Sequence, residues 1–369
     1  MKAVLHWFPV ALGVVFLLVL GFIQRERALR GENDFVQLYI GAKLAGTPHL
    51  YSREANLALE KATLGFTMDT VVYTRPPFYA ALLKPLSWLP YRVAYAVFSL
   101  ASLASLLWFV IRFSKECSSL AFFASMSIPA LAALCGGQDT AFLLAILGGS
   151  ILLTRQKRNF LAGMLLSLCA IKFHLFLFVP LLLLLKKRWS ILGGGAAGTA
   201  ILTLFGMLVA GPGALRQYVN VLRDPWINYK ATVMPNLHGL VATLHGDARM
   251  EFALVAIVAA GFLWTLSKTE NYEFLFAASL VAGLLVSFHS GMTDDLILLP
   301  AFVLVMGSCT QPALRVAAGL ILTPIPYFMV MADAPYSAIV PVTLLLMLGM
   351  FLIACRGAGK TMIAAPVAC

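Results

Sequence analysis

Among the side chains of this sequence that are suited to acid–base chemistry, Asp34 stands out by its position. It follows the apolar run 4–23 closely and opens a segment in which apolar residues recur with helical spacing. A transfer to a hydroxyl group needs a base that takes the hydroxyl proton, and one carboxylate suffices when the leaving group is already an anion. An aspartate in this place can also serve as a helix N-cap. The spacing alone leaves both interpretations open.

Lys172 is the second candidate, because it lies in the middle of the apolar stretch 159–185. Ionisable residues inside a membrane segment usually mark a functional site, and an ammonium group can hold a phosphate as a point charge. A lysine that extends its apolar stem toward the membrane surface is the structural alternative. Three cations in a later polar region, Arg216, Arg223 and Lys230, are further candidates for a phosphate site, although surface cations are usually only solvated.

Other polar side chains gather in short motifs between the apolar runs. The paired prolines of the segment 73–78 fix φ and remove two hydrogen-bond donors, which gives a rigid wall or a simple turn. We predict no metal and no cofactor. A divalent cation held by His238, His289 and Asp295 is the alternative, although no spacing among them supports it. The candidate substrate-binding residues are Tyr73, Arg75, Gln138, Asp139, Asn236, His238, His289 and Asp295.

The composition excludes a soluble globular protein. Of the 369 residues, 61% are hydrophobic and only 12% are charged, whereas soluble domains have about a quarter charged residues. Repeated apolar runs of about 20 residues are typical of membrane-spanning helices. We therefore predict an all-α polytopic membrane protein that forms a single domain over 1–369. The twelve expected crossings are 4–23, 92–111, 118–135, 140–153, 160–171, 174–185, 190–210, 250–267, 272–288, 295–307, 314–331 and 337–355.

The positive charges indicate the orientation in the membrane. The net charge of +11 collects in short loops such as 155–158 and 186–188, and only Glu116, Glu270 and Glu273 accompany them. Basic loops stay in the cytoplasm, so the pattern favours cytoplasmic termini in a plasma or inner membrane. Because the charge is one-sided in this way, it argues against a nucleic-acid partner. The large loop 24–91 and the loop 211–249 are then extracytoplasmic.

Two regions allow more detailed predictions. The segment 159–185 is either one long helix or two short helices with Lys172 at an outward turn, and the hairpin is favoured because it keeps both basic clusters on one side. Within the first outer loop, Phe35, Leu38, Tyr39 and Ala42 have the spacing of an amphipathic helix. A second helix is expected over 55–63, and a proline-broken re-entrant segment over 76–89. The six cysteines are scattered, without the spacing of a disulfide framework or a zinc site.

An acid after the first crossing and an aromatic-Pro-Pro segment resemble the polyprenol-phosphate-sugar-dependent glycosyltransferases of family 87. These are membrane enzymes of the C-type superfamily and include α-1,2-mannosyltransferases. The segment Tyr73-Thr74-Arg75-Pro76-Pro77-Phe78 resembles the family's Tyr-Pro-Pro step with Thr74-Arg75 inserted. Gly137-Gln138-Asp139-Thr140 is similar to its Gly-Gln-x-Asn segment, with Thr140 in place of the asparagine.

Later motifs extend the resemblance. Lys172 follows a helix with Ala162-Gly163, as in the family, although His174 replaces the usual proline. Asn236-Leu237-His238-Gly239 is similar to an Asn-x-Ser-Gly segment, and His289 with Asp294-Asp295-Leu296 to a late His…Asp-Leu motif. The resemblance implies that Asp34 is the catalytic base and that His238, His289 and Asp295 face it across one cavity.

The predicted function is the transfer of a hexose, with mannose as the first choice, from a polyprenyl-phosphate sugar to a glycolipid or glycan at the outer membrane face. The expected partners are this donor, the acceptor and membrane lipid. A lipid or glycan transporter or flippase would also need many crossings, but it should show matching broken helices in two halves. A non-catalytic assembly subunit is the third possibility, since it would account for the departures at Thr140 and His174.

Overall fold

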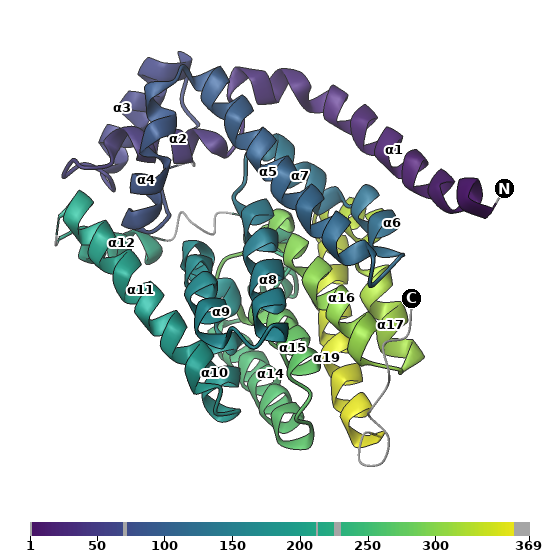
Figure 1. Ribbon diagram of the computed structural model, residues 1–369. Helices are drawn as coiled ribbons and strands as arrows, with labels where there is room; N and C mark the ends of the chain where they lie inside the picture. Colours follow the sequence, from purple (N-terminus) through teal and green to yellow (C-terminus); the bar gives the residue numbers. More distant parts are fainter. Residues whose placement is uncertain (1, 69–71, 212, 225–229, 358–369) are drawn as a thin grey trace.

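The computed structural model describes residues 2–68, 72–211, 213–224 and 230–357, and this part of the chain is helical without any strand (Figure 1). The region before the second long helix contains α1 (Lys2–Arg30), α2 (Phe35–Leu44), α3 (Arg53–Leu64), α4 (Pro77–Leu83) and the 3-10 helix η1 (Lys84–Trp88). The central part contains α5 (Tyr91–Ser114), α6 (Leu120–Ser125), α7 (Ile128–Gly136), α8 (Thr140–Arg155), α9 (Asn159–Leu166), η2 (Ser167–Phe176), α10 (Phe178–Leu185) and α11 (Trp189–Ala210). The remainder contains α12 (Ala214–Leu222), η4 (Ala231–Val233), α13 (Leu237–Thr243), α14 (Ala248–Lys268), α15 (Tyr272–Val286), η5 (Met292–Ile297), α16 (Leu298–Ser308), α17 (Pro312–Leu320), α18 (Pro324–Met331), η6 (Tyr336–Ala338) and α19 (Ile339–Gly357).

Each of the twelve expected crossings coincides with a helix or with two consecutive helices of this list. By length and composition, 5 described helices can cross a membrane, or up to 7 when each bent pair counts as one span. The bent pairs are α7–α8, with an angle of 119°, and α17–α18, with an angle of 48°. The all-helical membrane fold is thus confirmed, whereas the number of crossings and the cytoplasmic position of the termini stay predictions. Residues 358–369 lie outside the described part of the chain.

The packing of α9 against α11 decides between the two interpretations of 159–185. A side chain at Gly194 would collide with the carbonyl of Phe160, and one at Gly198 would collide with Ser167. Contacts therefore advance along both helices in the same direction, so α9 and α11 are parallel. The chain between them must return, and the helix breaks at Lys172, whose φ and ψ of −131° and 56° are not helical. This is the expected hairpin.

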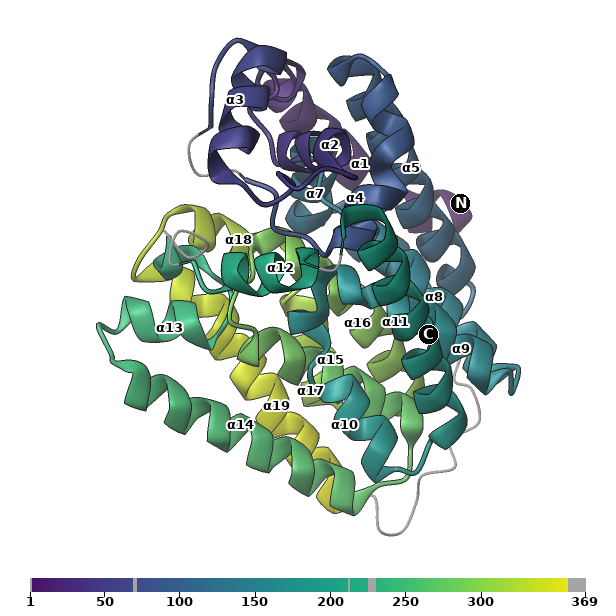
Figure 2. The same cartoon turned by 90° about the vertical axis from the view of Figure 1, so that its left-hand side faces the viewer.

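The first outer loop folds into the predicted helices, with one correction. Helix α2 begins at Phe35 as expected, but it is buried on nearly every side: Val36, Ile40 and Gly41 are enclosed together with the predicted apolar face. It is therefore a core helix and not an amphipathic surface helix. The Phe35 ring lies 4.9 Å from the ring of Phe98 and 5.7 Å from that of Tyr91, measured between centroids, and this packing fixes the start of α2. Figure 2 shows the α2–α4 group above α12 and α18.

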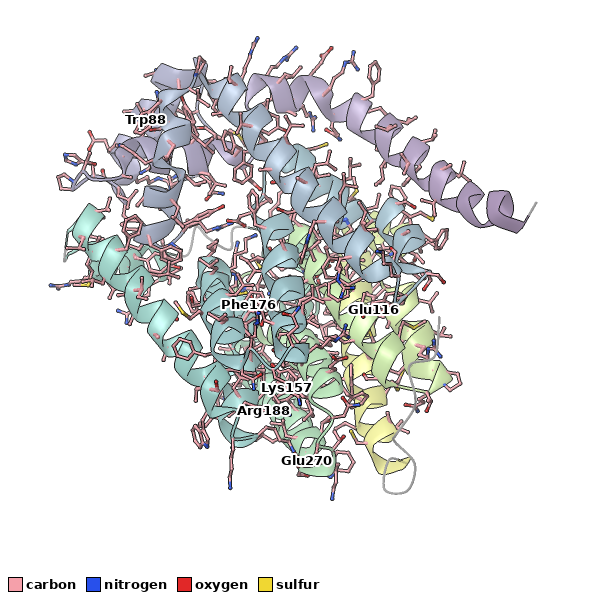
Figure 3. The ribbon with its side chains drawn as sticks, viewed as in Figure 1. Trp88, Glu116, Lys157, Phe176, Arg188 and Glu270 are labelled. Carbon is pink, nitrogen blue, oxygen red and sulfur yellow. The ribbon has the colours of Figure 1, made fainter. Side chains whose placement is uncertain are left out.

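The predicted cytoplasmic loops meet at the opposite end of the molecule. Arg155 lies 2.6 Å from Glu273 and 2.5 Å from Glu116, and Lys186 lies 2.6 Å from Glu270. In Figure 3, Lys157, Arg188 and Glu270 gather at the end of the bundle that is farthest from Trp88. The predicted cytoplasmic loops that carry these residues therefore lie together.

Candidate active site

A polar cavity of about 570 Å³ lies where the first outer loop meets the helical bundle. Its lining comes from segments far apart in the sequence, among them the start of α2, the turn before α8, the break in η2 and the turn before η5. The polar and charged side chains that line it are Asp34, Gln37, Arg53, Thr74, Arg75, Gln138, Lys172, His174, Asp224, Lys230, His289, Ser290, Thr293, Asp294 and Asp333.

Asp34 is partly buried at the edge of α2 and lines this cavity. It holds the N-cap position, but within the described residues its side chain makes no cap hydrogen bond. The neighbouring Asn33 satisfies the local backbone instead: its Oδ1 accepts from the Phe35 N–H at 3.0 Å and its Nδ2 donates to the Ala28 carbonyl at 2.9 Å. The Asp34 carboxylate is thereby left for another task than capping.

Gln138 is the partner of that carboxylate, and its Nε2 donates a hydrogen bond to Oδ2 of Asp34. The turn that carries Gln138 depends on Gly137, which has a φ of +62° and ends α7. A Cβ at Gly137 would collide with the Cβ of Phe35, so only glycine lets this turn approach the start of α2. Burial raises the pKa of Asp34 above its ordinary value, and the Gln138 hydrogen bond, then Arg75 and Lys172, act against that rise.

Four buried charges form a cluster behind this pair. Arg75 places its Nε 2.6 Å from Oδ2 of Asp139, and Lys172 places its Nζ 3.0 Å from the other oxygen of Asp139. Lys172 also lies 2.6 Å from Oδ1 of Asp294. Two cations thus balance two carboxylates, as buried charges require. Burial alone would raise the pKa of Asp294, but the charge and hydrogen bond of Lys172 hold it well below its usual range.

This cluster changes the interpretation of Lys172. Besides the two carboxylates, its Nζ donates to Oε1 of Gln138 and to Oγ1 of Thr140, each at 3.1 Å. An ammonium group has only three N–H bonds, so these four acceptors use all of its hydrogen-bonding capacity. A phosphate at Lys172 would have to displace one of them. The predicted role as a phosphate ligand stays a prediction, while the geometry gives Lys172 the role of a buried counterion.

Two histidines form another part of the cavity wall. The rings of His174 and His289 lie 6.1 Å apart, and the ring of His174 lies 5.1 Å from that of Phe288. Burial lowers the pKa of His289 to about 4, so its imidazole is neutral at physiological pH. A neutral imidazole can donate from one ring nitrogen and accept at the other. His289 thus fits a neutral polar ligand such as a hydroxyl group better than an anion.

Two predicted substrate-binding residues have structural tasks outside this lining. Tyr73 is fully buried, and its hydroxyl donates to the carbonyl of Pro76 at 2.9 Å. Asn236 caps α13 by accepting from the Gly239 N–H at 2.9 Å, and its Nδ2 donates to the Ser287 carbonyl at 2.8 Å. We therefore leave both out of the candidate site.

Five more predicted residues are not among the described residues that line the cavity, and one of them, Asp139, belongs to the charge cluster behind it through Arg75 and Lys172. His238 lies 3.0 Å from Glu251 instead, and Asp295 is fully buried beside Tyr327. Arg216 and Arg223 are exposed on α12 and at its end. The structure therefore brings together Asp34, Arg75, Gln138, Asp139, Lys172 and His289 from the predicted set.

Sequence reasoning missed Asp294, Gln37 and Arg53. Asp294 and Asp295 are adjacent in one motif, and only the position of η5 makes Asp294 the partner of Lys172. Gln37 lies three residues after Asp34 on α2, so the helical repeat could have placed it on the same side. Arg53 begins α3 and carries no sequence signal that separates it from a solvated cation.

No group of three or more His, Cys, Asp or Glu suited to a metal ion occurs among the described residues, and the prediction of no metal stays a prediction.

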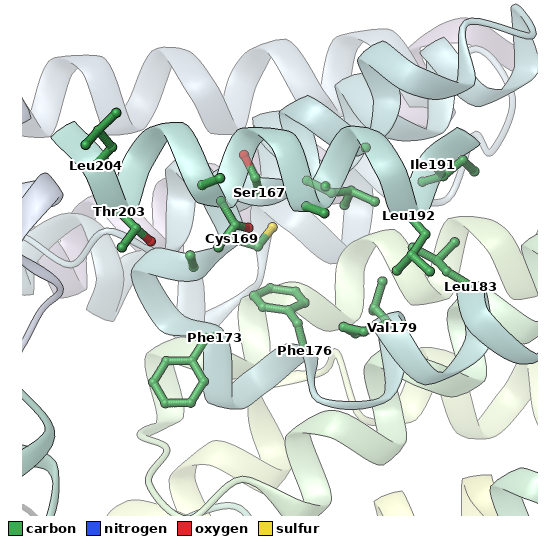
Figure 4. Close-up of a pocket in the computed structure, with 18 of the residues that line it drawn as sticks. Ser167, Cys169, Phe173, Phe176, Val179, Leu183, Ile191, Leu192, Thr203 and Leu204 are labelled. Carbon is green, nitrogen blue, oxygen red and sulfur yellow. The ribbon is translucent and has the colours of Figure 1, made fainter. Parts of the chain in front are cut away.

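An apolar groove of about 810 Å³ lies beside the polar cavity, between α11 and the α9–η2–α10 hairpin (Figure 4). Residues of η2 alternate between the two spaces. Lys172 and His174 line the polar cavity, whereas Cys169, Phe173 and Phe176 line the groove. The same short segment thus separates a polar cavity from an apolar groove.

Apolar helices that enclose a carboxylate-bearing cavity are features of an integral membrane protein that binds a polar ligand. The model of glycosyltransferase family 87 matches residues 73–290, which is more than half of the chain, and the chain belongs to that family. It is therefore a membrane glycosyltransferase. Comparison with curated proteins and with solved structures gave no match. Asp34 precedes the matched segment, so its assignment depends on the geometry described above and on the motif resemblance.

Proposed function

We propose that this glycosyltransferase moves a hexose, most readily mannose, from a polyprenyl-phosphate sugar to a hydroxyl group of a glycolipid or glycan at the outer membrane face. The observation that carries the proposal is the wall shared by the cavity and the groove. Phe173 lines the apolar groove, while its neighbours Lys172 and His174 line the polar cavity. A lipid-linked sugar has the same two parts, a hydrocarbon chain and a polar head, joined at the phosphate.

The charges around the cavity fit the proposed chemistry. In the transfer, the acceptor oxygen attacks the anomeric carbon, and the bond from that carbon to the phosphate oxygen breaks. The lipid phosphate leaves with the bonding electron pair, and Asp34 takes the acceptor proton. Because the leaving phosphate is already an anion, a second carboxylic acid is not needed to protonate it. Arg53 and Lys230 line the cavity outside the buried cluster of Arg75, Lys172 and their carboxylates, and a cation in such a place can stabilise this anion.

A transfer assay on the purified protein tests the proposal. Purified chain in detergent or nanodiscs would receive radiolabelled polyprenyl-phosphate mannose and a mixture of glycolipid acceptors. We expect labelled glycolipid and one free polyprenyl phosphate for each transfer. Movement of the intact donor across a vesicle membrane without product would favour a flippase, and loss of both activities from the pure chain would favour an assembly subunit.

Asp34→Asn tests the role of the proposed base. Asparagine keeps the shape and a hydrogen-bond acceptor but removes the basicity, so turnover should fall by roughly 10²–10⁴-fold, the usual scale of acid–base catalysis. Asp247→Asn is the matched control, because Asp247 is an aspartate that does cap a helix: its Oδ1 accepts from the N–H groups of Arg249 and Met250. An active Asp34→Asn protein would overturn the assignment and move the test to Asp294.

A further inference from the structure

Gln138 occupies a junction between the proposed base and the buried charge cluster. Its Oε1 accepts two hydrogen bonds from cations, one from Nζ of Lys172 at 3.1 Å and one from Nη2 of Arg75 at 3.3 Å. Its Nε2 donates to Oδ2 of Asp34. The side chain is nearly buried, with 9% of its surface exposed. All three contacts come from segments distant in the sequence.

The two cations fix the orientation of this amide. An amide oxygen has two lone pairs, and here each one meets a positively charged donor. Rotation of the amide by half a turn would place its NH₂ against Lys172 and Arg75 and its oxygen against the Asp34 carboxylate. In the rotated amide, the NH₂ group would repel the two cations and the oxygen would repel the carboxylate. The electrostatic contacts therefore fix the amide of Gln138 in the observed orientation.

The cations are themselves held in place by carboxylates. Arg75 is fixed by Asp139, and Lys172 is fixed by Asp139 and Asp294. A chain of charge-assisted hydrogen bonds thus runs from the core of the site to the edge of the cavity. Such bonds are short and directional, and they hold a side chain more firmly than neutral ones do.

We propose that Gln138 is a positioning residue, whose amide is oriented by Lys172 and Arg75 so that it holds one oxygen of Asp34 and leaves the other oxygen for the acceptor hydroxyl. The inference rests on the proposed role of Asp34 as the base. It replaces the sequence-based interpretation of Gln138 as a sugar-binding residue. The two interpretations differ in what a change at Gln138 should alter: the titration of Asp34 or the affinity for the sugar.

The charge environment of Asp34 sets the expected direction. The groups that act on it electrostatically are Arg75, Lys172 and Asp139. The other titratable or charged groups that line the cavity are Arg53, His174, Asp224, Lys230, His289, Asp294 and Asp333. The Gln138 N–H favours the charged form of Asp34, so its removal should raise the pKa of Asp34. The acidic limb of the pH–activity profile should then move to higher pH.

Two substitutions at Gln138 and one control test this. Gln138→Glu keeps the shape and the two acceptor contacts with the cations, and it replaces the N–H donor by a carboxylate oxygen. Gln138→Met removes the donor without adding charge. We expect both substitutions to move the acidic limb of the pH profile of kcat to higher pH by about one unit or more, which is a tenfold change in proton affinity. The shift should be larger for Gln138→Glu. The control is Gln37→Met, since Gln37 lines the same cavity but accepts from the Thr74 hydroxyl at 3.2 Å. The acidic limb of the pH profile of Gln37→Met should stay where it is in the parent protein.

A measurement without substrate separates this inference from the proposed function. The carboxyl band of Asp34 can be followed by infrared difference spectroscopy across pH and identified by its loss in Asp34→Asn. Upward movement of its midpoint in Gln138→Glu and Gln138→Met would support the positioning role even if the transfer assay failed. An unmoved midpoint in folded Gln138→Glu, or a change limited to the KM for the donor, would overturn it.

Discussion

Nζ of Lys172 lies 2.6 Å from Oδ1 of Asp294, although 122 residues separate the two. The contact joins the break in the η2 hairpin to the first turn of η5, and the Thr140 hydroxyl reaches the same carboxylate oxygen at 3.2 Å. Three membrane segments are therefore tied together at the depth of the cavity. The proposed base, Asp34, is linked to this contact through Gln138, which bonds to both Asp34 and Lys172.

This contact predicts that loss of the Lys172 charge destabilises the fold. Lys172→Met would leave Asp139 and Asp294 buried with one cation, Arg75, between them. The removal of one partner from a buried ion pair typically costs about 3–5 kcal/mol. Thermal unfolding in detergent should show a lower transition temperature. The exposed Lys115→Met on the opposite face should show little change.

The double variant Lys172→Met with Asp294→Asn checks the cause of that loss. Neutralising one carboxylate restores the balance between Arg75 and Asp139, so part of the lost stability should return. Additive losses in the double variant would mean that the two side chains do not interact.

Asp34→Asn should make the protein more stable at neutral pH. Because burial raises the pKa of Asp34 in the folded state, the folded protein binds a proton at this site more tightly than the unfolded chain. Stability then falls as pH rises through the interval between the unfolded and the folded pKa. The asparagine variant avoids this loss, so its advantage should be present at neutral pH and vanish below the unfolded pKa.

Unfolding temperatures measured from about pH 4 to pH 8 would test this relation. The control is Asp247→Asn, where the carboxylate caps a helix at the surface. An Asp34→Asn protein that is less stable than the parent at neutral pH would contradict the burial argument.

The apolar groove should discriminate between donors of different chain length. Thr199 lines the groove on α11, so Thr199→Trp should narrow it. We expect a higher KM for a long polyprenyl donor and a smaller effect with a short-chain analogue, since only the long chain needs the groove. Ile201→Trp adds the same ring to an exposed position of the same helix. Equal effects of both variants on both donors would argue against the groove as the chain site.

The topology predicts which loops an impermeant reagent reaches from outside the cell. In a cysteine-free background, Glu54→Cys in α3 should be labelled in intact cells, because α3 belongs to the first outer loop. Gln156→Cys, in the loop after α8 on the face with Arg155 and Glu273, should react only after permeabilisation. Labelling of position 156 in intact cells would reverse the orientation.

The helical architecture and the polar loops at its two ends can be predicted from the sequence. Lengths of apolar runs predict spanning helices whatever their neighbours, and the basic loops meet on one face as the charge pattern requires. The Lys172 hairpin was also predicted, because a single long helix would have separated the two basic clusters. These features depend on local composition and on the distribution of charge, both of which can be read along the chain.

The contacts between side chains in the candidate site follow from the tertiary structure and not from the sequence pattern. Sequence spacing could not show that Gln138 faces Asp34 and not the substrate, since the two are 104 positions apart and Gly137 must approach Phe35 for the contact to form. It also could not choose Asp294 over its neighbour Asp295, or show that α2 is enclosed on nearly every side. Each of these depends on how one helix is rotated and placed against another, and that is fixed by the close packing of side chains from distant segments.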